Sequence, residues 1–341
     1  MVINGYRHIS GVVDEAQQKM QDIRSGKFKP LFTSSKKETD KIGGFYPSDQ
    51  IVIAARPGSG KTARLIQLMT DFADQTINPF YKDKIMILYD SWEMAGWRNI
   101  LRMISRKESI EVKALLDHNK ELEEERFKRL IEISNLFKNY PIFISSQPVT
   151  ASQWKENKKQ IQGKYPKHYI INLFDHTRLV LKSEESKEEE KLTALMFAGI
   201  ELKNNFNMIN IFLSQLNRNI ETGVSREKIG SNNIVSSDIF GGDSVYQAAD
   251  ICLTLNRPGI YGLEKFEGIP TGIDKSNPNK LDDLLVEGVL KQREGWTGNL
   301  YMKHNLAHNK IWDYEFNQNS NLIPMNQALN KNEQNKLEQT W

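Results

Sequence analysis

The sequence predicts an α/β fold: a doubly wound, mostly parallel sheet with helices on both faces and an antiparallel C-terminal extension. Near-continuous apolar segments recur along the chain, as strands covered on both faces do. Helical patterns separate the early segments, which is typical of alternating strands and helices, whereas the last segments follow one another without helices. The expected strands are residues 50–55, 85–89, 141–145, 169–174, 208–214, 250–256, 284–291 and 298–303.

Length and composition limit the classes of protein that this chain can be. Its 341 residues can bury the core of one large α/β domain with short extensions. The net charge of +3 is low for a protein that coats nucleic acid, although a local basic track would suffice for weak, reversible contacts. The single cysteine, Cys252, excludes an internal disulfide framework and a cysteine zinc site. Because the sequence shows neither an apolar run of about 18 residues nor a secretory signal, we expect a cytoplasmic protein without a membrane partner.

Three regions follow one another along the chain. Residues 1–30 carry one amphipathic helical pattern, and since one helix cannot bury its apolar face alone, it either packs on the core of its own chain or docks elsewhere. Residues 31–317 form the expected α/β domain. Residues 318–341 are rich in Asn and Gln and are expected to be disordered. The apolar positions of the first helix are Ile9, Val12, Val13, Ala16, Met20 and Ile23.

The strongest motif lies directly after strand 50–55, where a glycine-rich turn closes on Lys61 and Thr62 before a helical pattern. A phosphate-binding loop requires this order of strand, loop and helix, because backbone N–H groups converge there at a helix N-terminus. Lys61 would reach the β- and γ-phosphates of ATP, and the Thr62 hydroxyl would bind Mg²⁺. Ala55 replaces the usual first glycine, but the later glycines supply the essential turns. The predicted nucleotide-binding residues of the loop are Arg56, Pro57, Gly58, Ser59, Gly60, Lys61, Thr62 and Ala63.

Acidic residues follow two other expected strands. Hydrolysis of ATP needs an acid that organises the metal and a group that polarises water. Strand 169–174 runs into Asp175, the expected position for an aspartate that holds Mg²⁺. Asp90 and Glu93 come just past strand 85–89, where a carboxylate is well placed as general base. We assign this role to Glu93 rather than to Asp90.

Six elements match one family in order and spacing. They are Ala55-Arg56-Pro57, Ser91-Trp92-Glu93-Met94, Asp175, Leu213-Ser214-Gln215-Leu216-Asn217-Arg218, Gln247-Ala248-Ala249-Asp250 and Lys291-Gln292-Arg293-Glu294-Gly295. The family's counterparts read Ala-Arg-Pro, Ser-x-Glu-Met, a strand ending in Asp, Leu-Ser-Gln-Leu-Asn-Arg, Gln-Asp-Ala-Asp and Lys-x-Arg-x-Gly. Over about residues 9–317 the chain resembles the ATPase domain of ring-shaped replicative DNA helicases of the DnaB family.

This resemblance implies a RecA-like P-loop NTPase that uses ATP and Mg²⁺. It also implies a homo-hexameric ring that translocates 5′ to 3′ on single-stranded DNA and unwinds forked duplex DNA. The first helix would be a linker that docks on the adjacent subunit, because family members close their ring through such a contact. The compact, Lys- and Asn-rich chain would suit a phage or mobile-element protein, whose place would be the host cytoplasm.

The resemblance also assigns roles to individual residues. Glu93 would be the catalytic base, and Gln215 would sense the γ-phosphate and link hydrolysis to movement of the DNA-binding loops. Lys291 and Arg293 would reach the γ-phosphate bound by a neighbouring subunit, as an arginine finger does. Arg218, at the end of the fourth element, would help to bind the nucleotide. The predicted catalytic set is therefore Lys61, Glu93, Asp175, Gln215, Lys291 and Arg293.

Two departures from the family limit the resemblance. We find no counterpart of its N-terminal collar domain, so recruitment of a primase and dependence on a helicase loader do not carry over, and both stay open as partners. At the DNA-facing loop the family's arginine falls on Phe240, which either stacks on a base or packs into the core. Gly241 and Gly242 could present backbone N–H groups to phosphates, and Arg226 and Lys228 are the nearest basic candidates.

Two other functions stay open at this point. A recombination or repair ATPase of the RecA and RadA type shares the phosphate loop and the glutamate, but the fourth and sixth elements point away from it. A RecA-like regulatory ATPase without motor activity is the second alternative, which the unmatched collar domain and the weak DNA-facing loop keep open.

Overall fold

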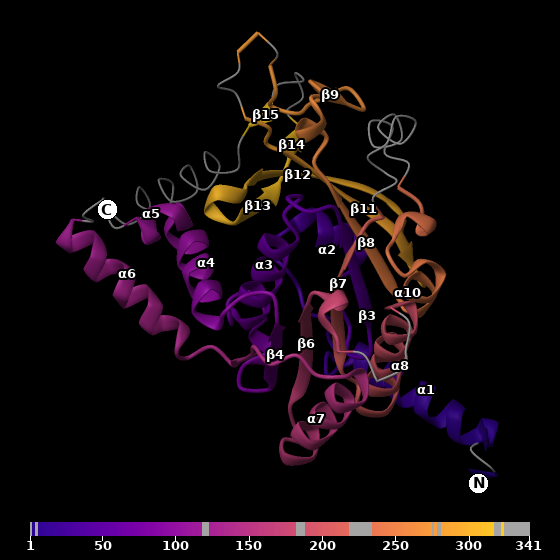
Figure 1. The fold of residues 1–341 in the computed structure, drawn as a ribbon. Helices are drawn as coiled ribbons and strands as arrows, with labels where there is room; N and C mark the ends of the chain where they lie inside the picture. The colour runs from indigo at the N-terminus through magenta and orange to yellow at the C-terminus, as the bar shows by residue number, and fades with distance from the viewer. Residues whose placement is uncertain are drawn as a thin grey trace, which may run out of the picture.

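One nine-stranded sheet dominates the structure, a computed structural model that describes residues 2–3, 6–117, 123–181, 188–217, 234–274, 276–277, 281–316 and 322–323 (Figure 1). Its order is β13-β12-β11-β8-β3-β7-β6-β4-β5. The strands from β8 to β5 in this order run parallel, and β11, β12 and β13 are antiparallel. The strands are β3 (Gln50–Ala55), β4 (Ile85–Ser91), β5 (Ile142–Ser145), β6 (Tyr169–Asp175), β7 (Ile209–Gln215), β8 (Ile251–Asn256), β11 (Leu284–Gln292), β12 (Gly298–Asn305) and β13 (Lys310–Asp313).

The predicted doubly wound sheet with an antiparallel C-terminal extension is confirmed, and every expected strand is present. The edge strand β13 was not expected, because its four residues, KIWD, follow a short 3₁₀ turn, Leu306–His308, and carry little alternation. The described residues also form three two-stranded pairs, none of which was expected. They are β1 (Val2–Ile3) with β2 (Tyr6–Arg7), β9 (Lys265–Phe266) with β10 (Ile269–Pro270), and β14 (Glu315–Phe316) with β15 (Leu322–Ile323).

Helices cover both faces of the sheet because the central strands are apolar on both sides. Along β3, Ile51 and Ile53 pack into one core cluster, and Val52 and Ala54 into another. The first cluster is completed by α2 (Lys36–Ile42), α3 (Lys61–Ala73) and α4 (Gly96–Glu108), with α5 (Val112–Leu116) and α6 (Glu124–Phe137) outside α4. The second is completed by α7 (Ala151–Lys164), α8 (Glu188–Phe206) and α10 (Gly242–Ala248).

The first helix, α1 (Ile9–Arg24), projects from the body of the molecule (Figure 1). None of its residues is buried, and its apolar side chains lie in the open, with Ile9 71% and Met20 62% exposed. Of the two alternatives left by the sequence, packing on the core of its own chain is therefore wrong. The tail expected to be disordered lies outside the described residues, apart from the short strand β15.

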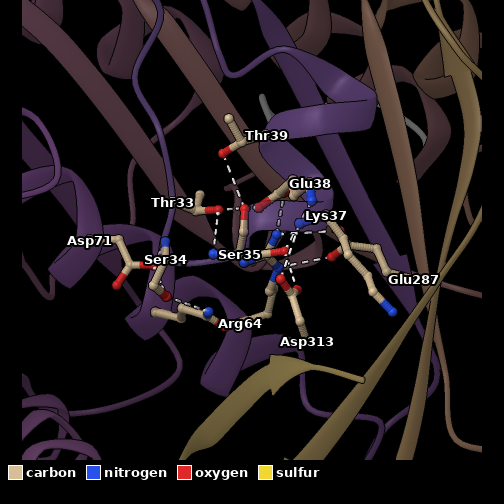
Figure 2. A network of polar contacts seen from close by, with 11 residues as sticks. Thr33, Ser34, Ser35, Lys37, Glu38, Thr39, Arg64, Asp71, Glu287 and Asp313 are labelled. Carbon is tan, nitrogen blue, oxygen red and sulfur yellow. Dashed lines mark hydrogen bonds and ion pairs between the residues drawn. The ribbon is translucent and has the colours of Figure 1, made fainter. Parts of the chain in front are cut away.

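A buried polar network joins α2 and α3 to the antiparallel strands (Figure 2). Arg64 on α3 is fully buried and forms ion pairs with Glu38 on α2 and with Glu287 on β11, whose Oε2 lies 2.8 Å from its Nε. Asp313 on β13 accepts hydrogen bonds from the Ser35 hydroxyl and the Lys37 amide at the start of α2. Burial raises the pKa of Glu287 to about 7, against the pull of the guanidinium. The network therefore fixes the helix that follows the phosphate loop to strand β11.

Candidate functional site

The phosphate loop joins the end of β3 to the start of α3, at the centre of the sheet. Gly58 and Gly60 have φ of +78° and +89°, a region that residues with a Cβ adopt at a cost. A Cβ at Gly58 would meet nothing within 4 Å, which leaves space for a ligand beside the loop, whereas one at Gly60 would lie 3.0 Å from Leu306. The loop thus has the open backbone that phosphate binding needs.

Lys61, the first residue of α3, points back along this loop. Its Nζ donates to the carbonyls of Ala55 at 2.8 Å and Arg56 at 3.1 Å. Burial lowers the pKa of Lys61 to about 8, opposed by the nearby carboxylates of Asp175 and Glu93. An incoming phosphate would supply a stronger acceptor for this ammonium group than the two carbonyls do.

Most of the predicted nucleotide-binding residues line one cavity of about 350 Å³ above the loop. The lining residues are Pro57, Gly58, Gly60, Lys61, Thr62, Ala63, Glu93, Arg102, Asp175, His176, Gln215, Arg257, Leu306 and Asn309. The cavity lies at the carboxyl ends of β3, β6 and β7, the usual ligand-binding edge of an open parallel sheet. Ser59 is buried under the loop, and Arg56 points away from the cavity, with its Nη1 donating to the Leu216 carbonyl at 2.9 Å.

The two carboxylates near the loop, Asp90 on β4 and Glu93 just past it, lie in different surroundings. Asp90 is buried and accepts from Trp154 Nε1 and Lys158 Nζ, both at 2.8 Å, on the face covered by α7. Glu93 comes after the strand, is exposed and lines the cavity. Only Glu93 of the two therefore has access to a water molecule beside the phosphate loop.

Asp175 ends β6 inside the cavity and is 4% exposed. Burial raises its pKa to about 6, with a further contribution from the charge of Glu93. The Tyr89 hydroxyl donates to Asp175 Oδ2 at 3.2 Å, which fixes the orientation of the carboxylate.

The residues fit a Mg²⁺ ion that binds together with the phosphates. Among the described residues, no cluster of three His, Cys, Asp or Glu side chains could hold a metal alone. Mg²⁺ commonly uses one or two protein ligands and completes its shell with substrate phosphates and water. Thr62 and Asp175 line the same cavity and provide a hydroxyl and a carboxylate, so this donor set suits Mg²⁺ carried by ATP.

Gln215 ends β7 and is held from two sides. Arg178 Nη1 donates to its Oε1 at 3.2 Å, and its Nε2 lies 2.7 Å from His176 Nε2. Because arginine has only donors, the amide oxygen must face Arg178 and the amide nitrogen must face His176. Burial lowers the pKa of His176 to about 4, so the ring is neutral near pH 7 and carries one proton. Its Nε2 accepts from Gln215 in the tautomer with the proton on Nδ1, whereas in the other tautomer Nδ1 accepts from the Arg178 backbone N–H, 3.3 Å away.

Lys291 and Arg293 lie at the opposite edge of the sheet from the cavity. β11 runs antiparallel to β8, so Gln292 pairs with Ile251 at the start of β8, whereas the phosphate loop begins level with Leu255. At about 3.3 Å per residue, the two places are roughly 13 Å apart along the strand. Lys291 Nζ donates to the carbonyls of Tyr246 and Gln247, both at 3.0 Å, and Arg293 pairs with Asp250 at 3.0 Å. Neither side chain lines the cavity of its own chain.

The predicted DNA-contact residues are only partly described. Phe240 is half-buried, and the Arg178 guanidinium lies 4.4 Å from its ring centroid, so its ring is neither free nor packed into the core. Gly241 and Gly242 lead directly from it into α10. The predictions for Arg218, Arg226 and Lys228 lie outside the described residues.

Five residues of the cavity were missed by sequence reasoning: Arg102, His176, Arg257, Leu306 and Asn309. Arg102 on α4 is one of several basic residues on that helix, and nothing in one sequence separates it from the others. Arg257 directly follows β8, and its guanidinium bonds to the Gly58 carbonyl and to Asp282. Its place after a strand beside β3 was a usable signal, as was the position of His176 next to Asp175.

Comparisons with known proteins agree with this geometry. The family model described as "DnaB-like helicase C terminal domain" matches residues 32–313. A probable replicative DNA helicase of Trieres chinensis is 28% identical over 275 residues, which cover 80% of this chain and 54% of that protein. The replicative DNA helicase DnaC of Bacillus subtilis is 25% identical over 282 residues, 82% of this chain and 55% of that protein. The chain thus spans about half the length of these curated relatives.

Two solved structures share the fold. One is an ATPase domain, which superposes with a TM-score of 0.73 at 20% identity, covering 89% of this chain and 99% of that one. A DnaB-like replicative helicase studied with its interactions with primase gives a TM-score of 0.71 at 19% identity, covering 89% and 67%. The sheet is therefore that of RecA-like DnaB ATPase domains. Among the described residues, no helix is both long and apolar enough to cross a bilayer. Because the family model matches most of this chain, residues 32–313, the chain belongs to the DnaB-like helicase C-terminal domain family.

Proposed function

We propose that this protein is an ATP-driven DNA helicase that works as a homo-hexameric ring and translocates 5′ to 3′ on single-stranded DNA. One observation carries the proposal. Lys61, Glu93, Asp175 and Gln215 share a single cavity, while Arg293 lies at the opposite edge of the same sheet. A site divided in this way is completed when the edge of one subunit that carries Lys291 and Arg293, its finger edge, faces the cavity of the next subunit.

The residues of the cavity have separate tasks in the proposed reaction. Lys61 and the loop backbone would hold the phosphates, and Thr62 and Asp175 would hold the Mg²⁺ ion, which would supply neutralisation of the phosphate charge. Glu93 orients the attacking water and accepts its proton. Gln215, whose amide is fixed in one orientation, donates from Nε2 towards the end of the phosphate chain once it leaves His176.

The ring follows from contacts of unlike surfaces. A head-to-tail contact between finger edge and cavity is heterologous and must close or grow into a filament. We propose that α1, whose apolar side chains are exposed, docks on the neighbouring subunit and favours closure. Such a protein would work in the cytoplasm, or in the host cytoplasm if a phage encodes it. Because one structure of similar fold is a helicase with its interactions with primase, a primase, like a helicase loader, is a further candidate partner.

Unwinding of a forked duplex with ATP and Mg²⁺ tests the proposal directly. Forks with only a 5′ tail, only a 3′ tail, or both would be compared, with Lys61→Ala as the control. We expect unwinding that needs ATP and the 5′-tailed strand and is absent in Lys61→Ala. An ATPase rate indifferent to single-stranded DNA, without unwinding, would instead support the regulatory ATPase. Filaments on DNA without unwinding would support the recombinase.

A further inference from the structure

Arg178 holds an unusual position between the nucleotide cavity and the protein surface. It lies on a short 3₁₀ turn (Thr177–Leu179) three residues past Asp175, and its side chain is exposed. Its guanidinium carbon lies 4.4 Å from the centroid of the Phe240 ring, and Nη1 donates to Gln215 Oε1 at 3.2 Å. Among the described residues, no carboxylate forms an ion pair with Arg178. Within the described part of the chain, the guanidinium donates to the side chain of Gln215, and its several N–H donors suit an anion such as phosphate.

Phe240 is joined to the same glutamine through the backbone. Its N–H donates to the carbonyl of Gln215 at 2.8 Å, and its own carbonyl accepts from the Ser214 hydroxyl at 3.4 Å. The 3₁₀ turn after β6 and the segment before α10 thus meet at Gln215, one through a side chain and one through the main chain. Gln215 and His176 line the nucleotide cavity, whereas Arg178 and Phe240 do not.

We propose that Arg178 binds a backbone phosphate of single-stranded DNA and that this contact controls the orientation of the Gln215 amide. The proposal rests on the helicase function proposed above and deepens it. The contact with the Phe240 ring restricts the position of the guanidinium, whose coplanar N–H donors match the oxygens of a phosphate. The Lys191 ammonium donates to the Arg178 carbonyl at 2.8 Å and adds positive charge beside the turn. The exposed end of the ring is also available to a base of the same strand.

The control of Gln215 follows from hydrogen-bond chemistry. Arg178 alone dictates that the amide oxygen faces away from His176, because it can only donate. A phosphate is a charged acceptor and competes with the neutral amide oxygen for the same Nη1. When Arg178 turns to the strand, the Gln215 side chain is released to rotate towards the nucleotide. Arg178 is thus a positioning residue for the γ-phosphate sensor, switched by the strand.

Binding and turnover of Arg178→Ala and Arg178→Lys test this inference. Arg98→Ala is the matched control, since Arg98 is also exposed and lies over an aromatic ring, 4.9 Å from the centroid of Trp97, but has no contact with Gln215. Binding of a fluorescent oligo-dT would be measured as a function of salt concentration. ATPase rates would be measured with and without that oligonucleotide, giving kcat and KM for ATP.

We expect Arg178→Ala to bind the oligonucleotide about ten-fold more weakly, as removal of a charged hydrogen bond does. The slope of log affinity against log salt should fall by about 0.7 for each phosphate that the variant no longer neutralises. Stimulation of kcat by DNA should be abolished. Arg178→Lys should restore the salt slope but not the stimulation, because lysine keeps the charge without the planar fork that contacts Phe240 and donates to Gln215. Arg98→Ala should behave as wild type.

Two results would overturn the inference while leaving the helicase proposal standing. One is an Arg178→Ala protein with unchanged oligonucleotide affinity, salt slope and stimulation. The other is a variant whose KM for ATP rises while its affinity for oligo-dT is unchanged, which would place the guanidinium on the nucleotide instead. If the wild type itself neither binds oligo-dT nor responds to it, the proposed function fails first.

Discussion

At the scale of single residues, burial drives two charged groups beside the phosphate loop, Asp175 and Lys61, towards their neutral forms. The pKa of Asp175 is raised to about 6 and that of Lys61 is lowered to about 8. Magnesium and phosphate favour the charged form of each group, so nucleotide binding must be linked to proton exchange. Below its pKa Asp175 must lose a proton to bind the metal, and above its pKa Lys61 must gain one to bind the phosphates.

We therefore predict that the affinity for Mg²⁺-ATP is greatest between about pH 6 and pH 8. It should fall on the acid side because Asp175 becomes protonated, and on the alkaline side because Lys61 becomes neutral. Near pH 8, binding should take up about half a proton for each nucleotide. Fluorescent-nucleotide titrations from pH 5 to pH 9.5, with calorimetry in buffers of different ionisation enthalpy, measure both quantities.

Two substitutions separate the limbs of this profile. The terminal phosphate of ATP also titrates near a pKa of about 6, so Asp175→Asn reports how much of the acid limb belongs to the ligand. Lys61→Arg stays charged throughout the range and should remove the alkaline limb. A profile that is flat from pH 7 to pH 9.5, or an alkaline limb that survives in Lys61→Arg, would contradict the assignment to Lys61.

Sequence reasoning found the residues whose position is set by a strand end. Asp175 and Gln215 end buried apolar segments, and Lys61 ends the glycine-rich loop that follows one, so their place at the carboxyl edge of the sheet could be predicted. Arg102 reaches the cavity from a helix, and its partner Asn309 is 207 positions away along the chain. Contacts of this kind depend on the order of strands in the sheet, which one sequence does not display.

At the scale of elements, the buried ion triad explains how the loop helix is held. Arg64 is shared between Glu38 and Glu287, so α2, α3 and β11 meet at one guanidinium (Figure 2). Its Nη1 has no hydrogen-bond partner among the described residues. Removing one partner from a buried group of charges typically costs about 3–5 kcal/mol, because the others are left uncompensated. The triad thus links the phosphate loop to the strand that carries Lys291.

The exposed face of α1 leads to a prediction about assembly. Val13→Asp should convert the ring into monomers, since burying one such side chain at an interface stabilises it by about 1.5–3 kcal/mol and an added charge there costs more. The fold of the monomer should not change, because Val13 is 44% exposed and no residue of α1 is buried. Mass photometry measures the assembly, and urea denaturation checks the fold.

Gln18→Asp is the control for this prediction, because it adds the same charge on the opposite face of α1. It should leave the ring intact. Rings of unchanged mass in Val13→Asp would show that α1 is not part of the contact between subunits.

Elements could be predicted from the sequence where the pattern of apolar residues within one segment is enough to define the element. The parallel strands are apolar on both faces and bounded by helices, so their existence and order along the chain were clear. Strand β13 is short and lies at an edge, and only its pairing with β12 defines it. For α1 the amphipathic pattern indicated a helix. The same pattern fits a helix that packs on its own chain and a helix whose apolar face is exposed for docking on another subunit.

At the scale of the whole molecule, the position of Lys291 and Arg293 decides whether one subunit alone can form a complete catalytic site. Lys291 lies near the end of β11 and Arg293 directly follows it, and because β11 runs against the parallel strands, both residues lie at the edge opposite to the phosphate loop. The chain alone therefore holds half of two different sites. If the proposed ring forms, every catalytic site lies between two subunits.

This division predicts that two inactive variants restore each other. Lys61→Ala lacks a working phosphate loop but keeps its finger, and Arg293→Ala keeps its loop but lacks the finger. In rings mixed at equal amounts, about a quarter of the contacts would pair an intact loop with an intact finger. ATPase activity should then rise well above the sum of the separate variants, up to about a quarter of the wild-type rate. Native mass spectrometry would verify that the rings are mixed. Mixed rings without any gain in activity would mean that Arg293 acts within its own subunit or not at all, and the opposite edges of the sheet would need another explanation.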